Sequence, residues 1–347
     1  MPTWGEQLQE LREIKEAEDK KPPTPGGPSP HDILRRRYLA ALHEHTERAV
    51  IVYATSWMEN RPVPNVEALS VNLGDKQGFM EAVSNLSEKN LDLIITSPGG
   101  SPEAAEAIMG YLRTRFEHIR AVVPVAAMSA ATMMALACDE ILMGTHSQLG
   151  PIDPQFTIPT PEGPRSSPGQ AILDQFELAK QECQDPRNIG AWLPLLRSLM
   201  PGLIAQCLHS RQQAERFVAR QLATHMLKDD PKKAVEVAKW FTNFSYFQSH
   251  NRAVTVADVE ERELTVTRLE SDQTLQDLVL SVHHAVRHTF NNTGTTKLIE
   301  NHHGRAYLEI TQPVGPVLVE QVPAQLSPTA PTPPPNRQQR RQGQINR

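Results

Sequence analysis

Two strand-to-helix junctions in the first half of the chain carry the residues with the most distinctive chemistry. A strand predicted at 91–97 runs into Gly99 and Gly100, whose backbone N–H groups can face a cavity as an oxyanion site requires. A strand at 120–126 leads to Ser129 at the start of an apolar helix over 129–139. The helix dipole and the small neighbours Ala130 and Ala131 favour a serine hydroxyl that substrate can reach. The pattern predicts a nucleophilic serine beside an oxyanion site.

Each junction taken alone has a simpler explanation. A serine at a helix start is most often an N-cap, and two adjacent glycines can simply form a tight turn. Both junctions, however, follow consecutive predicted parallel strands, and α/β folds place their sites at the carboxyl ends of such strands. The chain has no GxxxxGK[ST] loop, and no third glycine follows Gly99 and Gly100 in register. Phosphate binding at these junctions is therefore not expected.

The elements that must position these residues alternate between strands and helices. Strands are predicted at 48–57, 91–97, 120–126 and 140–144, with helices at 80–88, 101–116 and 129–139 between them. This alternation is typical of βαβ units with a parallel sheet, so the fold class is α/β. Beyond a proline-dense loop at 145–168 the sequence is mainly helical, with helices at 171–183, 203–227, 231–244 and 271–291. We expect a helical C-terminal half docked on the sheet.

Proline marks the boundaries of the folded body. Of 29 prolines, five lie in residues 22–30 and eight in 313–335. We predict an amphipathic N-terminal arm (1–19), a Pro/Gly linker (20–30), a folded domain (31–312, with its sheet core at 48–156 and a mainly helical part at 171–291) and a disordered basic tail (313–347). The six prolines of 151–168 lie between the serine helix and the helix at 171–183. They are expected to form the rim of the active-site cleft.

Composition excludes several classes of protein. A net charge of −5 argues against nucleic-acid binding by the folded body. Three cysteines without CxxC spacing support neither a disulfide framework nor a cysteine zinc site. No stretch is long and apolar enough for a transmembrane segment, and the charged start does not resemble a signal peptide. We therefore expect a cytoplasmic protein.

Three segments resemble a known family. ITSPGG (95–100), VPVAAMSAATMMALACDEILMG (123–144) and HSQLGPIDPQF (146–156) look like the serine dehydrogenase proteinase family of Clp-fold serine peptidases, related to Clp protease and signal peptide peptidase A. The similarity extends over nearly all of residues 35–310. It implies a crotonase/Clp-like spiral of ββα units, a peptide or protein substrate and a homo-oligomer. It also implies that Ser129 is the nucleophile and that the amides of Gly100 and Ala130 are the oxyanion donors.

The general base is where this chain departs from its relatives. Clp protease has a histidine about as far after its nucleophile as Asp153 follows Ser129, but this chain has GPIDPQ there. Signal peptide peptidase A uses a lysine roughly fifty residues after its serine, which matches Lys180, and a buried lysine can act as a base. His146 and Asp153 are weaker candidates. Ala131 replaces the usual glycine, and its methyl group is expected beside the nucleophile, where it would narrow the site.

A set of histidines in the last third of the chain has the spacing of a conceivable metal site. His284 and His288 have i, i+4 spacing on one predicted helix, and His302 and His303 follow. Because no HExxH glutamate or evident carboxylate partner accompanies them, we interpret these histidines as packing or interface residues. We predict no metal and no cofactor.

These observations predict a serine endopeptidase in which Ser129 attacks the peptide carbonyl and Lys180 moves the proton. Two alternatives stay open. A crotonase-like acyl-CoA enzyme would use the same paired amides to stabilise a thioester enolate, although that chemistry does not need Ser129. A catalytically degenerate scaffold that binds peptides is supported by Ala131 and by the missing Clp-type histidine.

Overall fold

The computed structural model describes residues 3–22, 26–59, 63, 66–158 and 163–311. Met1–Gln312 form one unit of the chain. The predicted basic tail lies outside the described residues, as does part of the predicted linker. The α/β class with a largely helical C-terminal part is confirmed.

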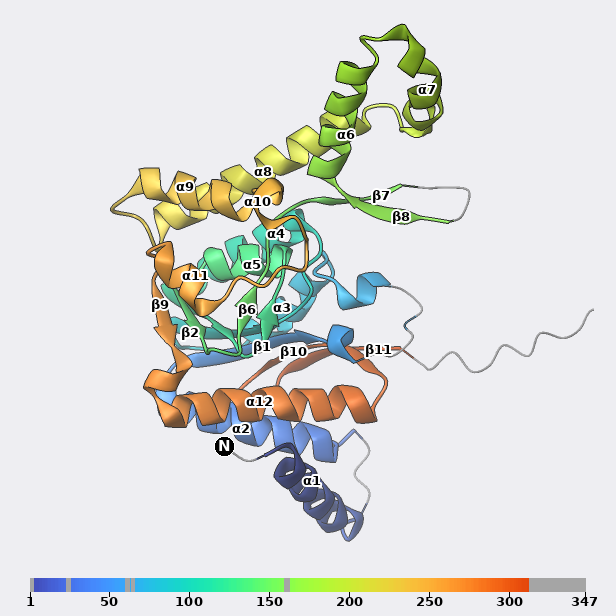
Figure 1. Cartoon of the computed structure of the whole chain (residues 1–347). Coiled ribbons are helices and arrows are strands. Elements are labelled where there is room, and N and C mark those ends of the chain that lie inside the picture. Colours follow the sequence, from blue (N-terminus) through green and yellow to red (C-terminus); the bar gives the residue numbers. More distant parts are fainter. Residues whose placement is uncertain (1–2, 23–25, 60–62, 64–65, 159–162, 312–347) are drawn as a thin grey trace, which may run out of the picture. The chain divides into compact units, whose positions relative to one another are not determined.

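Within the described residues, seven strands form the main sheet in the order β11-β10-β1-β2-β3-β5-β9 (Figure 1). The last five strands of this order are mutually parallel: β1 (Ala49–Thr55), β2 (Asn90–Thr96), β3 (His118–Val123), β5 (Glu140–Met143) and β9 (Val266–Arg268). Two antiparallel strands complete one edge: β10 (Thr295–Asn301) and β11 (Ala306–Ile310). The predicted parallel pairing of consecutive strands is therefore correct, and β10 and β11 extend the sheet beyond the prediction.

The sheet is covered on both faces, which explains why its central strands are mostly apolar. Along β1, residues 49, 51 and 53 pack on one face and residues 50, 52 and 54 on the other. The helices of the first face include α3 (Asp75–Val83), α4 (Pro102–Arg113) and α5 (Ala130–Leu136). The second face is covered by α2 (Pro30–Thr46) and α12 (Gln273–Asn292) (Figure 1).

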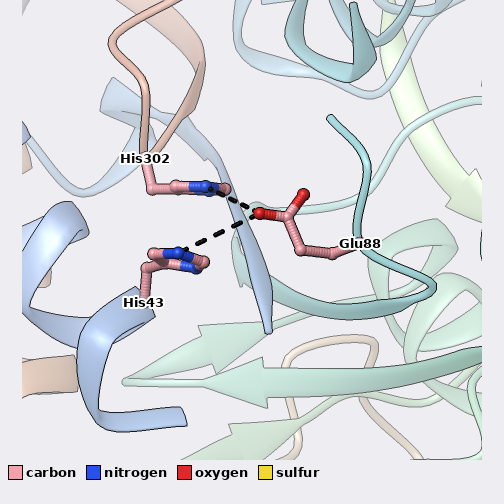
Figure 2. Close-up of side chains that lie close together, drawn as sticks. All are labelled: His43, Glu88 and His302. Atoms are coloured by element: carbon pink, nitrogen blue, oxygen red, sulfur yellow. Dashed lines mark ion pairs between the residues drawn. The ribbon is translucent and has the colours of Figure 1, made fainter. Parts of the chain in front are cut away.

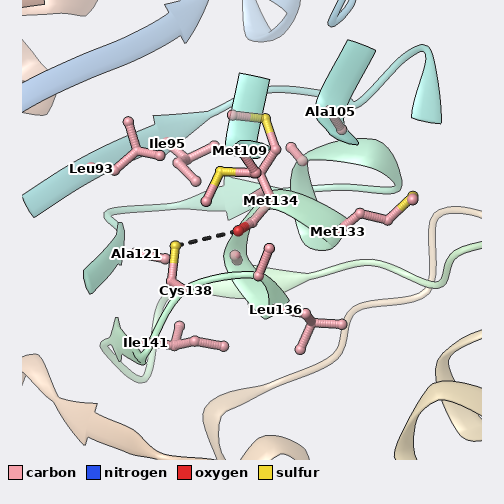
Figure 3. Packing of buried hydrophobic residues seen from close by; sticks show 14 of the residues in the cluster. Leu93, Ile95, Ala105, Met109, Ala121, Met133, Met134, Leu136, Cys138 and Ile141 are labelled. Atoms are coloured by element: carbon pink, nitrogen blue, oxygen red, sulfur yellow. Dashed lines mark hydrogen bonds between the residues drawn. The ribbon is translucent and has the colours of Figure 1, made fainter. Parts of the chain in front are cut away.

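The helix that begins after Ser129 lies in the densest part of this core. All seven residues of α5 are buried, among them Met133 and Met134. Figure 3 shows them packed with Leu93 of β2 and Ile141 of β5. Flexible methionine side chains fill the irregular space between helices and sheet. Because α5 is held on all sides, the start of this helix has a fixed position relative to the strand ends.

The second half of the chain is mainly helical, as predicted. Its helices are α6 (Gly169–Glu182), α7 (Ile189–Ser198), α8 (Leu203–Thr224), α9 (Pro231–Phe241), α10 (Phe244–Phe247) and α11 (Val256–Glu261). The proline-dense segment is not a plain loop, because it contains the antiparallel hairpin of β7 (Gln155–Ile158) and β8 (Arg165–Pro168). A short parallel pair, β4 (Ala126–Ala127) with β6 (Gln148–Leu149), precedes it. The 3-10 turns are η1 (Ser56–Met58), η2 (Val66–Leu69), η3 (Pro186–Asn188) and η4 (Leu269–Ser271).

The predicted N-terminal arm is a helix, α1 (Trp4–Asp19), that packs on the body of the protein. Leu11 and Ile14 are buried against Leu34 and Ala285. The side-chain amide of Gln7 donates a hydrogen bond of 3.1 Å to the Ser281 carbonyl. The arm therefore covers the outer surface of α2 and α12.

Buried charges tie the strand β10 to the helices. The Lys297 ammonium lies 2.6 Å from an Asp75 carboxylate oxygen, and both side chains are fully buried. Tyr53 donates a hydrogen bond of 2.8 Å to the same carboxylate. Glu300 pairs with the buried Arg35 at 2.7 Å. Each charge has a partner, which is the condition for burying it at a tolerable cost.

Among the described helices, none is by itself long and apolar enough to cross a membrane. One pair, Pro186–Ser198 with Leu203–Thr224, passes that test jointly by length and composition, and it is bent by 66°.

Candidate active site

Backbone hydrogen bonds bring the two predicted junctions side by side. The Ser97 amide donates to the Ala126 carbonyl at 3.1 Å, and the Met128 amide donates to the Ser97 carbonyl at 2.9 Å. The chain beyond β2 therefore runs parallel to the chain that leads into α5. The expectation that Gly99, Gly100 and Ser129 lie at one edge of the sheet is met.

This approach requires residues without side chains. A Cβ atom on Gly99 would lie 2.5 Å from the Met128 carbonyl oxygen and 2.7 Å from the Ser129 Cβ. A Cβ atom on Gly100 would lie 2.3 Å from the Val71 carbonyl oxygen. Gly99 has a φ of +95°, which side-chain-bearing residues rarely adopt. The glycine pair is thus fixed by both space and backbone conformation.

Ser129 has an unusual backbone conformation, with φ 52° and ψ −116°. Its side chain makes no capping hydrogen bond to α5, so it does not act as the N-cap that was the simpler explanation. A non-glycine residue in a sparsely populated region between a strand and a helix is characteristic of nucleophile turns, which hold the hydroxyl out of the backbone. Ser129 is half-buried and lines a cavity.

Two backbone amides close to Ser129 in the chain or in the fold are not used by the secondary structure around them. The Val71 amide donates to the Gly99 carbonyl at 2.7 Å, and the Val71 carbonyl accepts from Ser101 at 2.8 Å. In this pairing Gly100, which lies between them, directs its own N–H away from Val71. Ala130 is the first residue of α5, so its N–H has no acceptor within the helix. Both predicted oxyanion donors therefore have amides not used by the adjacent secondary structure.

The cavity in front of Ser129 has a volume of about 290 Å³. Met133, Ile152, Phe156 and Ala214 give it an apolar wall. Among its described lining residues the ionisable side chains are Glu103, Asp153 and His250. A cavity with apolar walls and a few convergent polar groups is the common form of a catalytic site.

A histidine–aspartate pair lines the same cavity as Ser129. Asp153 is 3% exposed, and its Oδ1 is in short contact with Nδ1 of His250. The Gln155 amide donates a hydrogen bond of 2.7 Å to Oδ2 of the same carboxylate. A carboxylate at Nδ1 favours the tautomer that carries its hydrogen there, which leaves Nε2 as a proton acceptor. Asp153, a weak candidate from sequence, thus orients a histidine.

The segment that carries Asp153 is anchored on both sides. The Thr132 hydroxyl in α5 donates a hydrogen bond to the Gly150 carbonyl oxygen and accepts one from the Gly150 N–H group, each at 3.0 Å. On the other side the Ile152 amide donates to the Phe241 carbonyl at 2.8 Å. Leu149 and Val254 exchange two backbone hydrogen bonds of 2.9 Å. The chain around His250 is therefore fastened to the same segment that holds Asp153.

His250 was missed by sequence reasoning. It lies between α10 and α11, far along the chain from Ser129 and in the sequence FQSHNR, which matches no catalytic motif. The one available signal was Asp153, whose buried carboxylate needs a partner.

The structure does not bring Lys180 to Ser129. The Lys180 side chain is 56% exposed and pairs with Glu177 at 2.8 Å. The buried side of α6 consists of Gly169, Ile172 and Ala179, which leaves Lys180 on the solvent side. It is not among the described residues that line the cavity. The desolvation that a lysine base requires is absent, so this assignment is corrected.

His146 and Ala131 also differ from expectation. His146 is exposed in the turn between β5 and β6, where its ring folds over Gly144, and it does not appear among the described lining residues. Ala131 is fully buried in the main core and is not among the described residues that line the cavity. The expected narrowing of the site does not occur.

The histidines considered as a metal site lie in two separate places. His284 and His288 contact Trp4 of α1, with the Trp4 and His288 rings stacked at 3.8 Å. His302 stacks on His43 of α2 at 3.9 Å instead. The interpretation as packing histidines agrees with these contacts.

Figure 2 shows the second place, where His43 and His302 both face Glu88. The Nε2 atoms of His302 and His43 lie 3.3 and 4.0 Å from a Glu88 oxygen. Three donor atoms at this spacing could hold a metal ion. However, the Val50 amide donates to Nδ1 of His302 at 3.2 Å, which puts the ring hydrogen on Nε2 rather than a lone pair. This tautomer suits a contact with the Glu88 carboxylate and does not suit metal ligation.

Comparison with known proteins agrees with this geometry. Residues 70–183 match the family of ClpP-like SDH-type serine proteinases. The matched region is about a third of the chain, contains Gly99, Gly100, Ser129 and Asp153, and is similar to this family of serine proteinases. The chain has a mixed α/β fold of the ClpP/crotonase type with a largely helical C-terminal part.

Individual relatives are more distant. Two uncharacterized proteins of Methanocaldococcus jannaschii are each 27% identical over 199 residues, which is 56% of this chain. The chain spans only 60% and 59% of their lengths. Among solved structures, a membrane-bound stomatin-specific protease (1510-N) has a TM-score of 0.37 and 11% identity, covering 60% of this chain and 79% of that one. A ClpP1 variant from Listeria monocytogenes has a TM-score of 0.31 and 12% identity, covering 60% and 96%.

We predict that Gly99→Ala destabilises the protein by at least about 2 kcal/mol, because alanine is strained at φ +95° and its methyl meets backbone atoms. Gly110→Ala is the matched control. Gly110 lies inside α4, and an added Cβ there would meet no atom within 4 Å, so this change is expected to stabilise by about 0.5 to 1 kcal/mol. Thermal unfolding of both variants measures the difference. Equal effects would contradict the close approach at Gly99.

We further predict that stability falls on acidification partly through His302. Burial lowers the pKa of His302 to about 4 from an ordinary 6.5. Between these values the unfolded chain binds a proton that the native protein does not, so unfolding becomes easier as pH falls from 7 to 5. Denaturant unfolding should show a loss of about 1 kcal/mol that His302→Gln removes. The exposed His209 is not among the groups that shift the His302 pKa, so His209→Gln should leave the wild-type pH slope intact.

Proposed function

We propose that the protein hydrolyses peptide bonds, with Ser129, His250 and Asp153 as its catalytic residues. The observation that carries this proposal is one cavity lined by a serine in a strained strand-to-helix turn and by a histidine whose Nδ1 contacts a buried carboxylate. The match of residues 70–183 to a family of serine proteinases supports the reaction class.

The mechanism follows from the placement of these groups. His250 Nε2 takes the proton of the Ser129 hydroxyl as Oγ attacks the carbonyl carbon, and Asp153 stabilises the imidazolium that forms. The negative charge on the carbonyl oxygen is held by the N–H groups of Gly100 and Ala130. His250 then protonates the leaving amine. A water molecule, activated by the same imidazole, releases the acyl group from Ser129.

Under this proposal, the two observations that favoured a catalytically degenerate scaffold, Ala131 and the missing Clp-type histidine, no longer favour it. The methyl of Ala131 lies in the core, and His250 supplies the imidazole that the sequence lacks after Ser129. The acyl-CoA alternative gains no specific support from the described residues, because it has no use for a serine in a nucleophile turn. A homo-oligomer and a cytoplasmic location remain proposals that rest on the sequence alone.

The nucleophile is tested with a fluorophosphonate probe and with hydrolysis of unfolded casein. Wild-type protein should be labelled and active, whereas Ser129→Ala should lose labelling and at least roughly a thousandfold in kcat. The exposed Ser87, changed to Ala, serves as a control that retains both. Labelling that persists in Ser129→Ala would sink the assignment.

The base is tested by comparing two variants. His250→Ala is expected to lower kcat by about 10² to 10⁴, since general base catalysis contributes that much. Lys180→Ala should stay within about twofold of wild type, because its ammonium is solvent-exposed and paired with Glu177. The reverse pattern, with Lys180→Ala inactive and His250→Ala active, would restore the lysine mechanism.

A further inference from the structure

The helices α6 and α7 and the strands β7 and β8 line an apolar groove that the catalytic proposal does not use. Its volume is about 190 Å³, and Ile172, Phe176, Trp192, Leu195 and Leu199 supply most of its lining. Among the described lining residues only Arg165 carries a formal charge. This volume is below the roughly 300 Å³ at which pockets for whole small-molecule ligands begin, so the groove suits one or two side chains.

The helix α7 that forms one side of the groove is unusual. Its sequence is IGAWLPLLRS, yet none of its ten residues is buried. Leu193 and Leu195 are 41% and 50% exposed. From 186 to 214 the sequence contains no acidic residue. Exposed apolar surface of this kind commonly marks a site of interaction with another molecule.

The strand β7 contributes one residue to this groove and one to the cavity in front of Ser129. Alternate residues of a strand share a face, and on β7 Phe156 lines the catalytic cavity while Ile158 lines the groove. Both side chains pack against the same small cluster of Ile172, Leu203 and Cys207. The two sites are therefore about 7 Å apart along one strand, the length of two residues of extended chain.

The base of the groove is also fixed to the catalytic segment. The Gly169 amide, at the start of α6, donates a hydrogen bond of 2.8 Å to the Pro154 carbonyl, next to Asp153. A Cβ atom on Gly169 would lie 2.9 Å from the Phe156 ring. A peptide that enters one site thus meets the other at a set distance.

We propose that this groove binds an apolar side chain of the peptide substrate, such as leucine or phenylalanine, a few residues away from the bond that is cleaved. This inference rests on the proposed function for its biological role. The occupant is a peptide because the groove has the size of a side chain and lies on the same strand as Phe156, which lines the cavity of Ser129. The substrate class is an unfolded or extended segment with an apolar residue at a fixed offset from the cleavage site.

The test measures binding without catalysis. In the Ser129→Ala background, fluorescence anisotropy follows a labelled casein-derived peptide with a Leu-Phe pair and a copy in which that pair is Ser-Ser. Leu195→Gln should weaken binding of the Leu-Phe peptide by roughly tenfold. Leu193→Gln is the matched control, because Leu193 is an exposed leucine of the same helix that does not line the groove. It should change Kd by less than about twofold, and the Ser-Ser peptide should bind weakly to all three proteins.

The outcomes separate this inference from the proposed function. If Leu195→Gln and Leu193→Gln change the Kd of the peptide equally, the groove is not a peptide-binding site, even if the wild type hydrolyses casein. A tenfold difference supports the groove even if no Ser129-dependent hydrolysis is found. Sedimentation and vesicle flotation check other occupants. If Leu195→Gln abolishes self-association or binding to anionic vesicles and leaves peptide binding unchanged, the groove belongs to a second copy or to a membrane surface.

Discussion

The site depends on one backbone contact between two loops. Ser97 hydrogen-bonds to Ala126 and Met128, and this pairing is possible only because Gly99 has no side chain to meet the Met128 carbonyl. The contact places the Gly100 amide beside Ser129 and holds the start of α5 in its strained conformation. Strain of this kind persists only where the surrounding structure enforces it. The buried, methionine-rich packing of α5 supplies that support. The backbone conformation of Ser129 therefore depends on the hydrophobic core around α5.

The helical C-terminal half contributes residues that line the cavity of the candidate site. In the proposed mechanism the parallel strand ends supply the nucleophile and the oxyanion donors, but no imidazole. The imidazole comes from the chain between α10 and α11, which is fastened to the Asp153 segment by the hydrogen bonds of Leu149 with Val254 and of Ile152 with Phe241. The same helices form the wall of the cavity around Ala214. Without this layer, Asp153 would be a buried carboxylate without its histidine partner.

The parts of this structure that were predictable are those set by local sequence. The alternation of strands and helices, the glycine pair and Ser129 depend on residues close together in the chain. His250 was not predictable, because its contact with Asp153 joins residues 97 positions apart. Lys180 was misassigned because helical periodicity shows that α6 has two faces but not which face α8 covers. The strand β10 was missed because Lys297 and Glu300 give it a polar sequence, and only their partners Asp75 and Arg35 explain its burial.

The prolines around Asp153 have a consequence for the entropy of the site. Pro151 and Pro154 bracket this residue, and proline restricts both its own backbone and that of the residue before it. The unfolded chain therefore samples fewer conformations around Asp153 than an ordinary loop would, and folding loses less freedom there. A carboxylate that must orient a histidine is thus held by a segment that is already stiff before it folds. Proline opposes regular structure elsewhere in a chain, yet here it lowers the entropic cost of ordering the catalytic loop.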